Sequence, residues 1–403
     1  MKMNILVFLK VRAWVIKMPL IMFILTFIFP ILSIPLNFVL TIISKKDKKY
    51  FMMNNAVALA FFAYNWIPPK NYDLYVWQLN CSMLAKLPFI SVIKYILTNG
   101  EPLNNLIKYV IGLTGNFGLL QFTIILISYL IINKILLKYE EKFNLSKFSF
   151  SLIYLFTFLI LMYVNFISGL FFNFAAIIFT LGVIEFYDNK YKTGIFLIVI
   201  SALLHSGMFF PICIFLILIL NKSKVSLKSI IIAIIFGLSL SYIIPFLLSN
   251  INISIFSELS VMYKGYFLQN TYNSLNSGIT YFLNLLKLLP LVFILMFAKN
   301  KYSNSEALGI LIFVSSFLVS IKSPIFTRYF YMSCLMVLPK YGTYIDDKTE
   351  KNRRKSLNKC FFIMLLILIC LISGMYQIKL LLNIDFISII KNTILRPLIY
   401  ILM

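Results

Sequence analysis

The sequence contains little charge, few acids and a single histidine, His205. Only 12% of its 403 residues are charged, and 13 of these are acidic. It has no DxD motif, no HExxH motif, no CxxC pair and no Walker A loop. The absence of these motifs argues against a metal-dependent transferase, a zinc enzyme and an ATPase. We therefore expect neither a metal nor another cofactor.

The five cysteines follow no disulfide or metal-binding pattern. They lie at positions 81, 213, 334, 360 and 370, mostly in apolar runs, where cysteine packs as a small hydrophobic residue. The apolar run from Met18 to Ser44 is too long for a cleavable signal peptide and has no small-residue cleavage site. No internal repeat or soluble segment is evident, so we expect one integral membrane domain over residues 1–403.

Hydrophobic residues, by contrast, are abundant and form long runs. They make up 61% of the chain, and the mean hydropathy is +0.93. Because about 20 apolar residues suffice to cross a membrane, the sequence predicts an all-α, polytopic helical membrane protein with about 11–12 transmembrane helices. The expected spans are 18–44, 50–66, 117–137, 149–165, 168–186, 229–248, 280–298, 306–321, 325–340 and 358–376, with a hairpin over 193–220.

Basic residues cluster in the connectors between these runs. The formal net charge is +24, from 37 Lys and Arg against 13 Asp and Glu. Cytoplasmic loops of membrane proteins carry such an excess of cations, so the pattern indicates topology rather than nucleic-acid binding. It places 45–49 and the loop 341–357 in the cytoplasm, and the polar loops 67–115 and 249–279 outside. In the first outer loop, KLPFISVIKYIL and LNNLIKYVIGL are expected to be amphipathic helices on the membrane surface.

The run 193–220 contains the histidine and has basic connectors on both sides. The charge rule therefore predicts a hairpin that turns near His205. Arms of about 13 residues would reach only about 20 Å, so His205 would lie below the outer surface, at the floor of a cavity. An ionisable group at that depth is a functional candidate, as a general base or as a contact for phosphate or sugar hydroxyls. A hydrogen-bonded histidine that packs helices together is the alternative.

A few polar residues on the expected outer face are not required for topology. Lys322 and Arg328 lie on either side of a Ser-Pro helix break, and Lys264 lies in the loop 249–279. Cations at an outer pocket suit a diphosphate or another anion, although snorkelling to lipid headgroups is the alternative. Asp73 could act as a base, bind sugar hydroxyls or simply be solvated. Asn173 could contact substrate, but packing between helices is the commoner role of such an amide.

Three short motifs combine these residues. An outer Pro-rich turn leads into Asp-x-Tyr in PPKNYDLY, after a basic loop and a span. The second motif is a Gly-hydrophobic stretch (SGLFFNFA), followed by a basic turn (DNKYK) and a span that ends in Leu-His-Ser (ALLHSGMFF). The third is a late outer Arg-Tyr in IFTRYFYM, which makes Tyr329 a further candidate residue. Over about residues 45–340 this pattern resembles the Wzy/EpsG-like family of oligosaccharide repeat-unit polymerases.

The resemblance implies a metal-independent membrane glycosyltransferase that joins undecaprenyl-diphosphate-linked oligosaccharide repeat units into a surface polysaccharide, such as a capsule or O-antigen. It would act at the outer face of the bacterial cytoplasmic (inner) membrane, among membrane lipid, with a chain-length regulator protein as a candidate partner. The catalytic residues would be His205, Asp73 and Arg328, and the substrate-binding residues Lys322, Lys264, Asn173 and Tyr329.

The chain departs from the family at Val76 and Phe171, positions where the family often has arginine.

Two other functions fit parts of the same sequence pattern. A flippase or transporter of lipid-linked oligosaccharides would have repeat-related halves and cation-lined spans, whereas the expected spans are nearly free of charge apart from Lys287. A membrane acyltransferase using His205 would need further buried polar partners and a cytoplasmic pocket. The side of the membrane on which repeat units accumulate distinguishes a polymerase from a flippase.

Overall fold

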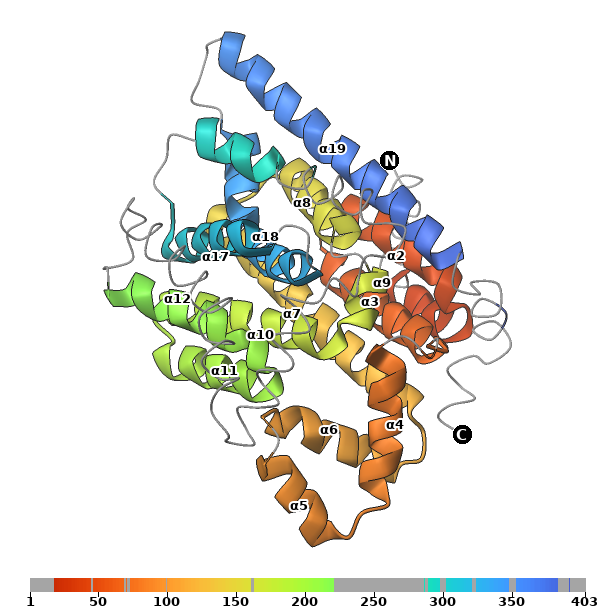
Figure 1. Ribbon diagram of the computed structural model, residues 1–403. Helices are drawn as coiled ribbons and strands as arrows, with labels where there is room; N and C mark the ends of the chain where they lie inside the picture. Colours follow the sequence, from red (N-terminus) through yellow and green to blue (C-terminus); the bar gives the residue numbers. More distant parts are fainter. Residues whose placement is uncertain are drawn as a thin grey trace.

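The computed structural model describes residues 18–44, 46–68, 73–98, 100–160, 163–220, 289–297, 302–320, 324–347 and 353–382, with single residues 70, 286 and 391. Within these ranges the chain is helical and contains no strand (Figure 1). The all-α fold expected from the apolar runs is therefore confirmed. The span 229–248, the loop 249–279 and the candidate residues Lys264 and Lys322 lie outside the described residues.

The first apolar segment is bent. One helix covers Met18–Ile28, and α2 (Pro30–Ile43) begins anew with proline at its first position. Asn37 Nδ2 donates a hydrogen bond to Thr26 Oγ1 over 3.3 Å. In a straight helix these two residues would lie about 16 Å apart along the axis, so this bond requires a sharp change of direction between the two helices.

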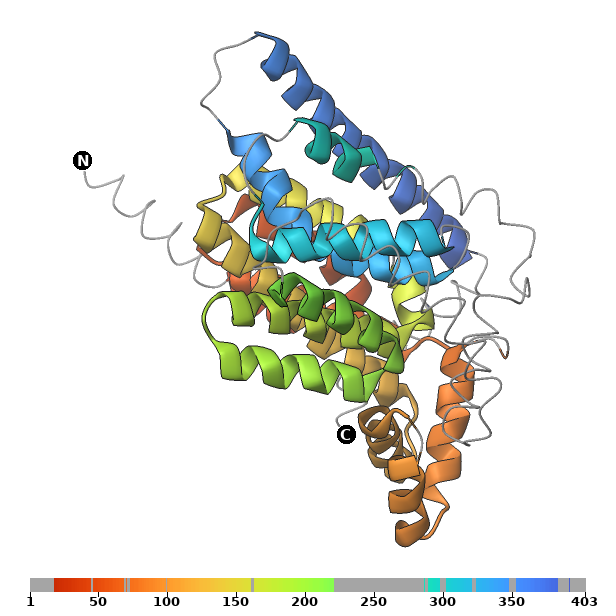
Figure 2. The same ribbon diagram turned by 60° about the vertical axis from the view of Figure 1, so that its left-hand side comes forward.

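Three short helices connect α3 (Lys48–Tyr64) to α7 (Gly118–Phe143). They are α4 (Asp73–Ala85), α5 (Phe89–Thr98) and α6 (Pro102–Leu113). The amphipathic pattern predicts α5 and α6 but not α4, whose apolar residues follow no helical period. In both views the three helices project from one end of the bundle, and Figure 2 shows α4 crosswise to the long helices (Figures 1 and 2). This arrangement suits helices that lie along a membrane surface.

The close approach of α4 and α6 depends on Gly112. A Cβ atom at this position would lie 2.2 Å from the backbone carbonyl oxygen of Cys81, far inside van der Waals contact. Only glycine lets the two helices pack at this separation, and this packing fixes where Asp73 and Glu101, at the N-terminal ends of α4 and α6, can lie.

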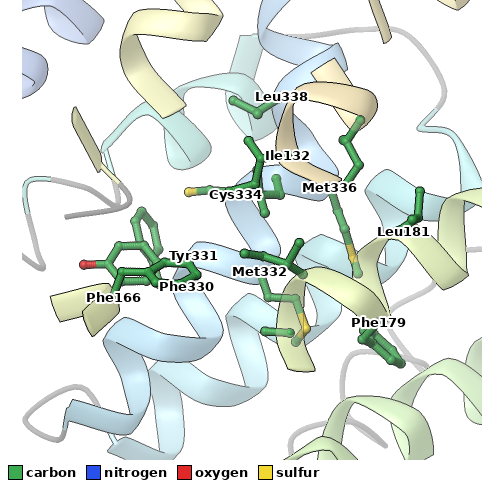
Figure 3. Packing of buried hydrophobic residues seen from close by; sticks show 14 of the residues in the cluster. Ile132, Phe166, Phe179, Leu181, Phe330, Tyr331, Met332, Cys334, Met336 and Leu338 are labelled. Carbon is green, nitrogen blue, oxygen red and sulfur yellow. The ribbon is translucent and has the colours of Figure 1, made fainter. Parts of the chain in front are cut away.

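The centre of the bundle is α10 (Leu170–Tyr187), whose residues are buried from Leu170 to Glu185. It packs against α7, α11 (Tyr191–Leu204) and α18 (Pro324–Asp346). Figure 3 shows buried side chains of α7, α10 and α18 together, among them Ile132, Phe179 and Met336. Residues at the ends of α10 and α18 are thus held by a packed core.

The run 193–220 forms the expected hairpin. α11 ends at Leu204, a short 3-10 helix η1 (Ser206–Met208) follows, and α12 (Phe209–Leu220) runs back (Figure 2). Between them His205 has an extended backbone, with φ −154° and ψ 125°. The arms have 14 and 12 residues. They would reach about 21 and 18 Å, less than the roughly 30 Å of the hydrocarbon layer.

An ion-pair network joins α7 to the α10–α11 turn at the other end of the bundle. Glu185 is 2% exposed and its Oε1 lies 3.1 Å from Lys138 Nζ. Asp188 pairs with Lys138 at 2.6 Å and also with Lys142. Burial alone would raise the pKa of Asp188, but hydrogen bonds from the two lysines outweigh it and lower the pKa. The charge rule assigns this end to the cytoplasm.

Three of the described helical segments are long and apolar enough to cross a membrane. They are α7, α10 and Ser356–Gln377 within α19 (Arg353–Leu382). Shorter apolar helices accompany them, including α8 (Lys147–Ile160) and most of α17 (Asn304–Ser320). The chain is therefore a helical membrane protein. The total of about 11–12 spans stays a prediction.

Candidate active site

Five parts of the chain meet at the end of the bundle that carries the His205 turn. They are the N-terminal ends of α4 and α6, the start of α10, the α11–α12 turn and the first turns of α18. Their side chains bring together Asp73, Arg328, His205 and Tyr329, which the sequence pattern also selects. In the described parts of the chain, no three His, Cys, Asp or Glu side chains gather in a way that could hold a metal ion.

Asp73 and Arg328 form an ion pair at the edge of this cluster. Arg328 Nη2 lies 3.6 Å from Asp73 Oδ2, and the side chains are 17% and 43% exposed respectively. Burial raises the pKa of Asp73 above the ordinary value of a carboxyl group, and the positive charge of Arg328 partly offsets this rise. A carboxylate that is partly desolvated yet still accessible is suited to accept a proton from a hydroxyl group.

The ring of Phe172, at the start of α10, connects the ion pair to the turn. Arg328 Cζ lies 5.5 Å from the centre of this ring, a cation–π distance. The Phe172 ring also meets His205 and Tyr329 edge-on, at centroid distances of 5.1 and 5.2 Å. Three candidate residues from two distant parts of the sequence therefore surround one buried phenylalanine.

The hydrogen bond at His205 determines which ring nitrogen carries the proton. The backbone N–H of Gly207 donates to His205 Nδ1 over 2.9 Å. A neutral imidazole that accepts at Nδ1 carries its hydrogen on Nε2. His205 therefore presents an N–H donor at Nε2, which is suited to an oxygen of a bound anion or sugar. Asp73 is the better placed of the two candidate bases.

Tyr329 holds the turn in place. It is 8% exposed, and its hydroxyl donates to the carbonyl oxygen of Gly207 over 2.7 Å. A Cβ atom at Gly207 would lie 2.9 Å from the Phe172 ring, so glycine is needed where the turn passes this ring. These contacts make Tyr329 a positioning residue for His205.

Glu101 is a site residue that the sequence motifs do not select, because it lies between the two amphipathic helices expected in the first outer loop. Glu101 Oε1 accepts hydrogen bonds from Ser206 N at 3.1 Å and Ser206 Oγ at 3.2 Å, and it lies 3.6 Å from His205 Nδ1. Its other oxygen accepts from Asn104 Nδ2 at 2.6 Å. Glu101 thereby ties the first outer loop to the hairpin turn over 100 residues away.

Replacing Glu101 with alanine should loosen the turn. Ser206 is buried, so loss of the acceptor leaves its N–H unpaired and should destabilise the protein by about 1–3 kcal/mol. Thermal unfolding of the purified protein measures this change. Glu101→Gln keeps a side-chain oxygen and should restore most of the lost stability. Glu141→Ala, at an exposed position near the end of α7, serves as the control. Equal stability of Glu101→Ala and the control would contradict the assignment.

Lys108 is a second cation that, like Arg328, lies close enough to His205 to interact with it electrostatically. This lysine of α6 is 6% exposed, and its Nζ lies 5.1 Å from the centre of the Phe171 ring. Burial lowers the pKa of Lys108, and the negative charge of Glu101 partly offsets the decrease. A bound anion would favour the charged form of this amine. Adjacent rings at the start of α10 thus each carry a cation, Lys108 over Phe171 and Arg328 over Phe172.

Asn173 is buried near the start of α10 and bonds back to the preceding helix. It is 3% exposed, and its Nδ2 donates to the carbonyl oxygen of Phe166 over 3.3 Å. This bond spans the break between α9 (Tyr163–Ser168) and α10. The geometry favours the helix-packing role of this amide over substrate binding.

These features define a helical membrane protein with a cluster of charged and polar side chains at one end of its bundle. The family comparison makes this class specific. Residues 48–388 match the EpsG family model, and the chain belongs to the EpsG family. The family resemblance of the three motifs is thereby confirmed, and the protein is a polysaccharide-polymerase-type, glycosyltransferase-like membrane enzyme. No curated protein and no solved structure significantly matches the chain.

Proposed function

We propose that the protein polymerises undecaprenyl-diphosphate-linked oligosaccharide repeat units at the outer face of the bacterial cytoplasmic membrane. The observation that carries this proposal is the Asp73–Arg328 ion pair, which lies beside His205 at one end of the bundle. A base, two cations and an N–H donor are the groups needed to transfer a glycosyl residue from a diphosphate.

In the proposed reaction a hydroxyl of one repeat unit attacks the anomeric carbon of the sugar that carries the lipid diphosphate on another. Asp73 accepts the proton of the attacking hydroxyl. A new glycosidic C–O bond forms while the bond from the anomeric carbon to the diphosphate oxygen breaks. The bonding electrons leave with the lipid diphosphate, and its negative charge is stabilised by the protein's cations.

Arg328 and Lys108 are the cations proposed for the diphosphate, with the Nε2–H of His205 as a further donor. Arg328 is suited to this role because guanidinium binds phosphate oxygens in pairs. Binding of the diphosphate to Arg328 would compete with Asp73 and free its carboxylate for the acceptor hydroxyl. Lys108 lies over Phe171, one of the two positions that lack the family arginine. Lys322 and Lys264 remain proposed further contacts, and a chain-length regulator protein remains a proposed partner.

Deletion of the gene should leave single lipid-linked repeat units on the outer face of the membrane. The units would be made and flipped, but not joined. Their position can be measured by labelling intact cells with a membrane-impermeant reagent for sugars. Single units accessible only after lysis would contradict polymerisation and favour a flippase. Retention of a full-length polysaccharide ladder in the deletion would contradict both functions.

A further inference from the structure

A cavity of about 250 Å³ lies at the basic end of the bundle, opposite the His205 turn. It is formed where α2 ends, α3 and α8 begin, and α7 approaches its last turn. The proposed polymerisation uses none of its residues. The lining residues are Thr41, Ile42, Ser44, Lys48, Glu140, Lys147, Phe150 and Ser151.

Two lysines provide hydrogen-bond donors in this cavity. Lys48 pairs with Glu140, and its Nζ lies 4.6 Å from the centre of the Phe150 ring. Lys147 Nζ donates to the carbonyl oxygen of Ile43 over 2.6 Å, at the end of α2. An ammonium group has three N–H donors, so each lysine keeps donors for a ligand beyond these contacts. With one carboxylate against two ammonium groups, the lining has a net positive charge.

The hydroxyl groups of the lining differ in whether their hydrogens are available to donate to a ligand. Thr41 and Ser151 each donate to a backbone carbonyl over 2.7 Å, so their hydrogens are engaged. Ser44 Oγ instead accepts from Asp47 N over 3.0 Å, which leaves its O–H to donate. Lys48, Lys147 and Ser44 together supply donors to an anion from the ends of three helices, α3, α8 and α2.

The cavity lies beside an apolar surface. Along α2, Leu36, Val39 and Ile43 are 41, 48 and 61% exposed, and Phe148 next to Lys147 is 56% exposed. In a membrane protein such a surface faces lipid chains. The volume is small for a complete ligand, since pockets for small molecules usually measure about 300–1,000 Å³. It is suited to a headgroup whose chains lie outside, along α2.

We propose that this cavity binds the phosphate group of an anionic phospholipid from the cytoplasmic leaflet. The lysines and Ser44 would hold the phosphate oxygens, while the acyl chains lie against α2. The cytoplasmic leaflet is rich in anionic lipids, which attract basic residues at the membrane surface. The site is independent of the proposed polymerisation. Inorganic phosphate offers the same charge without acyl chains, and the experiment separates the two sources.

The purified full-length protein, held in zwitterionic phosphatidylcholine micelles, can be titrated with phosphatidylglycerol while its thermal unfolding is followed. Phosphatidylglycerol should raise the unfolding temperature in a saturable way. Lys147→Gln should weaken binding and so raise the half-saturating concentration of phosphatidylglycerol roughly fivefold. Lys147→Arg should retain binding. Ser151→Phe should block binding by filling the cavity without removing a charge. Lys192→Gln, at an exposed site on the same end but outside the lining, should behave as wild type.

The outcomes separate the possibilities. An equal effect of millimolar inorganic phosphate would overturn the lipid as ligand. Equal weakening by Lys147→Gln and Lys192→Gln, with no effect of Ser151→Phe, would show general surface attraction and overturn the site. If Lys147→Gln fails to fold, Lys147→Arg and Ser151→Phe still decide, since only filling the cavity should abolish the response.

Discussion

Replacing Arg328 with alanine is expected to lower the rate of polymerisation by about 100-fold or more. The arginine lies between Asp73 and the Phe172 ring, so its loss removes the cation proposed to stabilise the departing diphosphate. It also leaves Asp73 without its positive partner. The measurement is the glycan chain-length ladder formed per unit time by purified protein in liposomes.

Two variants make this result specific to Arg328. Arg328→Lys retains the charge but not the paired N–H donors, and should give an intermediate rate. Lys94→Ala removes a cation from α5, where the residue is exposed and makes none of the contacts of the cluster, and should retain the wild-type ladder. A wild-type rate in Arg328→Ala would remove the arginine from the site.

Replacing Asp73 with asparagine should reduce the rate by about 10²–10⁴-fold, the usual contribution of a positioned general base. Asparagine preserves the shape of the side chain and removes the basic oxygen. The rate should be measured with saturating lipid-linked donor, so that loss of catalysis is separated from loss of binding. Asp47→Asn, at the opposite end of the bundle, should leave the rate unchanged.

The dependence on pH tests the same role. The base works when deprotonated, which is the form above its pKa. Because burial raises the pKa of Asp73, the wild-type rate should fall with decreasing pH already above the ordinary range of an aspartate. The residual rate of Asp73→Asn should lack this acid limb. An identical acid limb in both proteins would contradict the assignment of Asp73 as the base.

Much of the fold can be predicted from the sequence, because long apolar runs form membrane-spanning helices and basic connectors indicate on which side of the membrane these helices end. The hairpin at His205 is an example, since two basic flanks require an even number of crossings. α4 is not predicted because its apolar residues follow no helical period. Close packing against α6 at Gly112 is visible only in the structure. The bend before α2 is signalled by Pro30, but its sharpness is visible only in the Asn37–Thr26 hydrogen bond.

The candidate site is predictable only in part. Asp73, His205, Arg328 and Tyr329 stand out because charged or polar groups are rare in such a chain, and the structure brings them together. The signal for Glu101 is that it is one of two acidic residues in the loop 67–115, but its contact with Ser206 spans 105 positions. No local pattern encodes a contact at that separation.

The most direct test of the central claim uses purified protein in liposomes supplied with lipid-diphosphate-linked single repeat units. The product ladder and the released lipid diphosphate are measured for the wild type and for a variant combining Asp73→Asn with Arg328→Ala. The account predicts one lipid diphosphate released per glycosidic bond in the wild type, and neither product in the variant at matched protein level. A wild type that forms no ladder, or a variant that forms the same ladder, would contradict it.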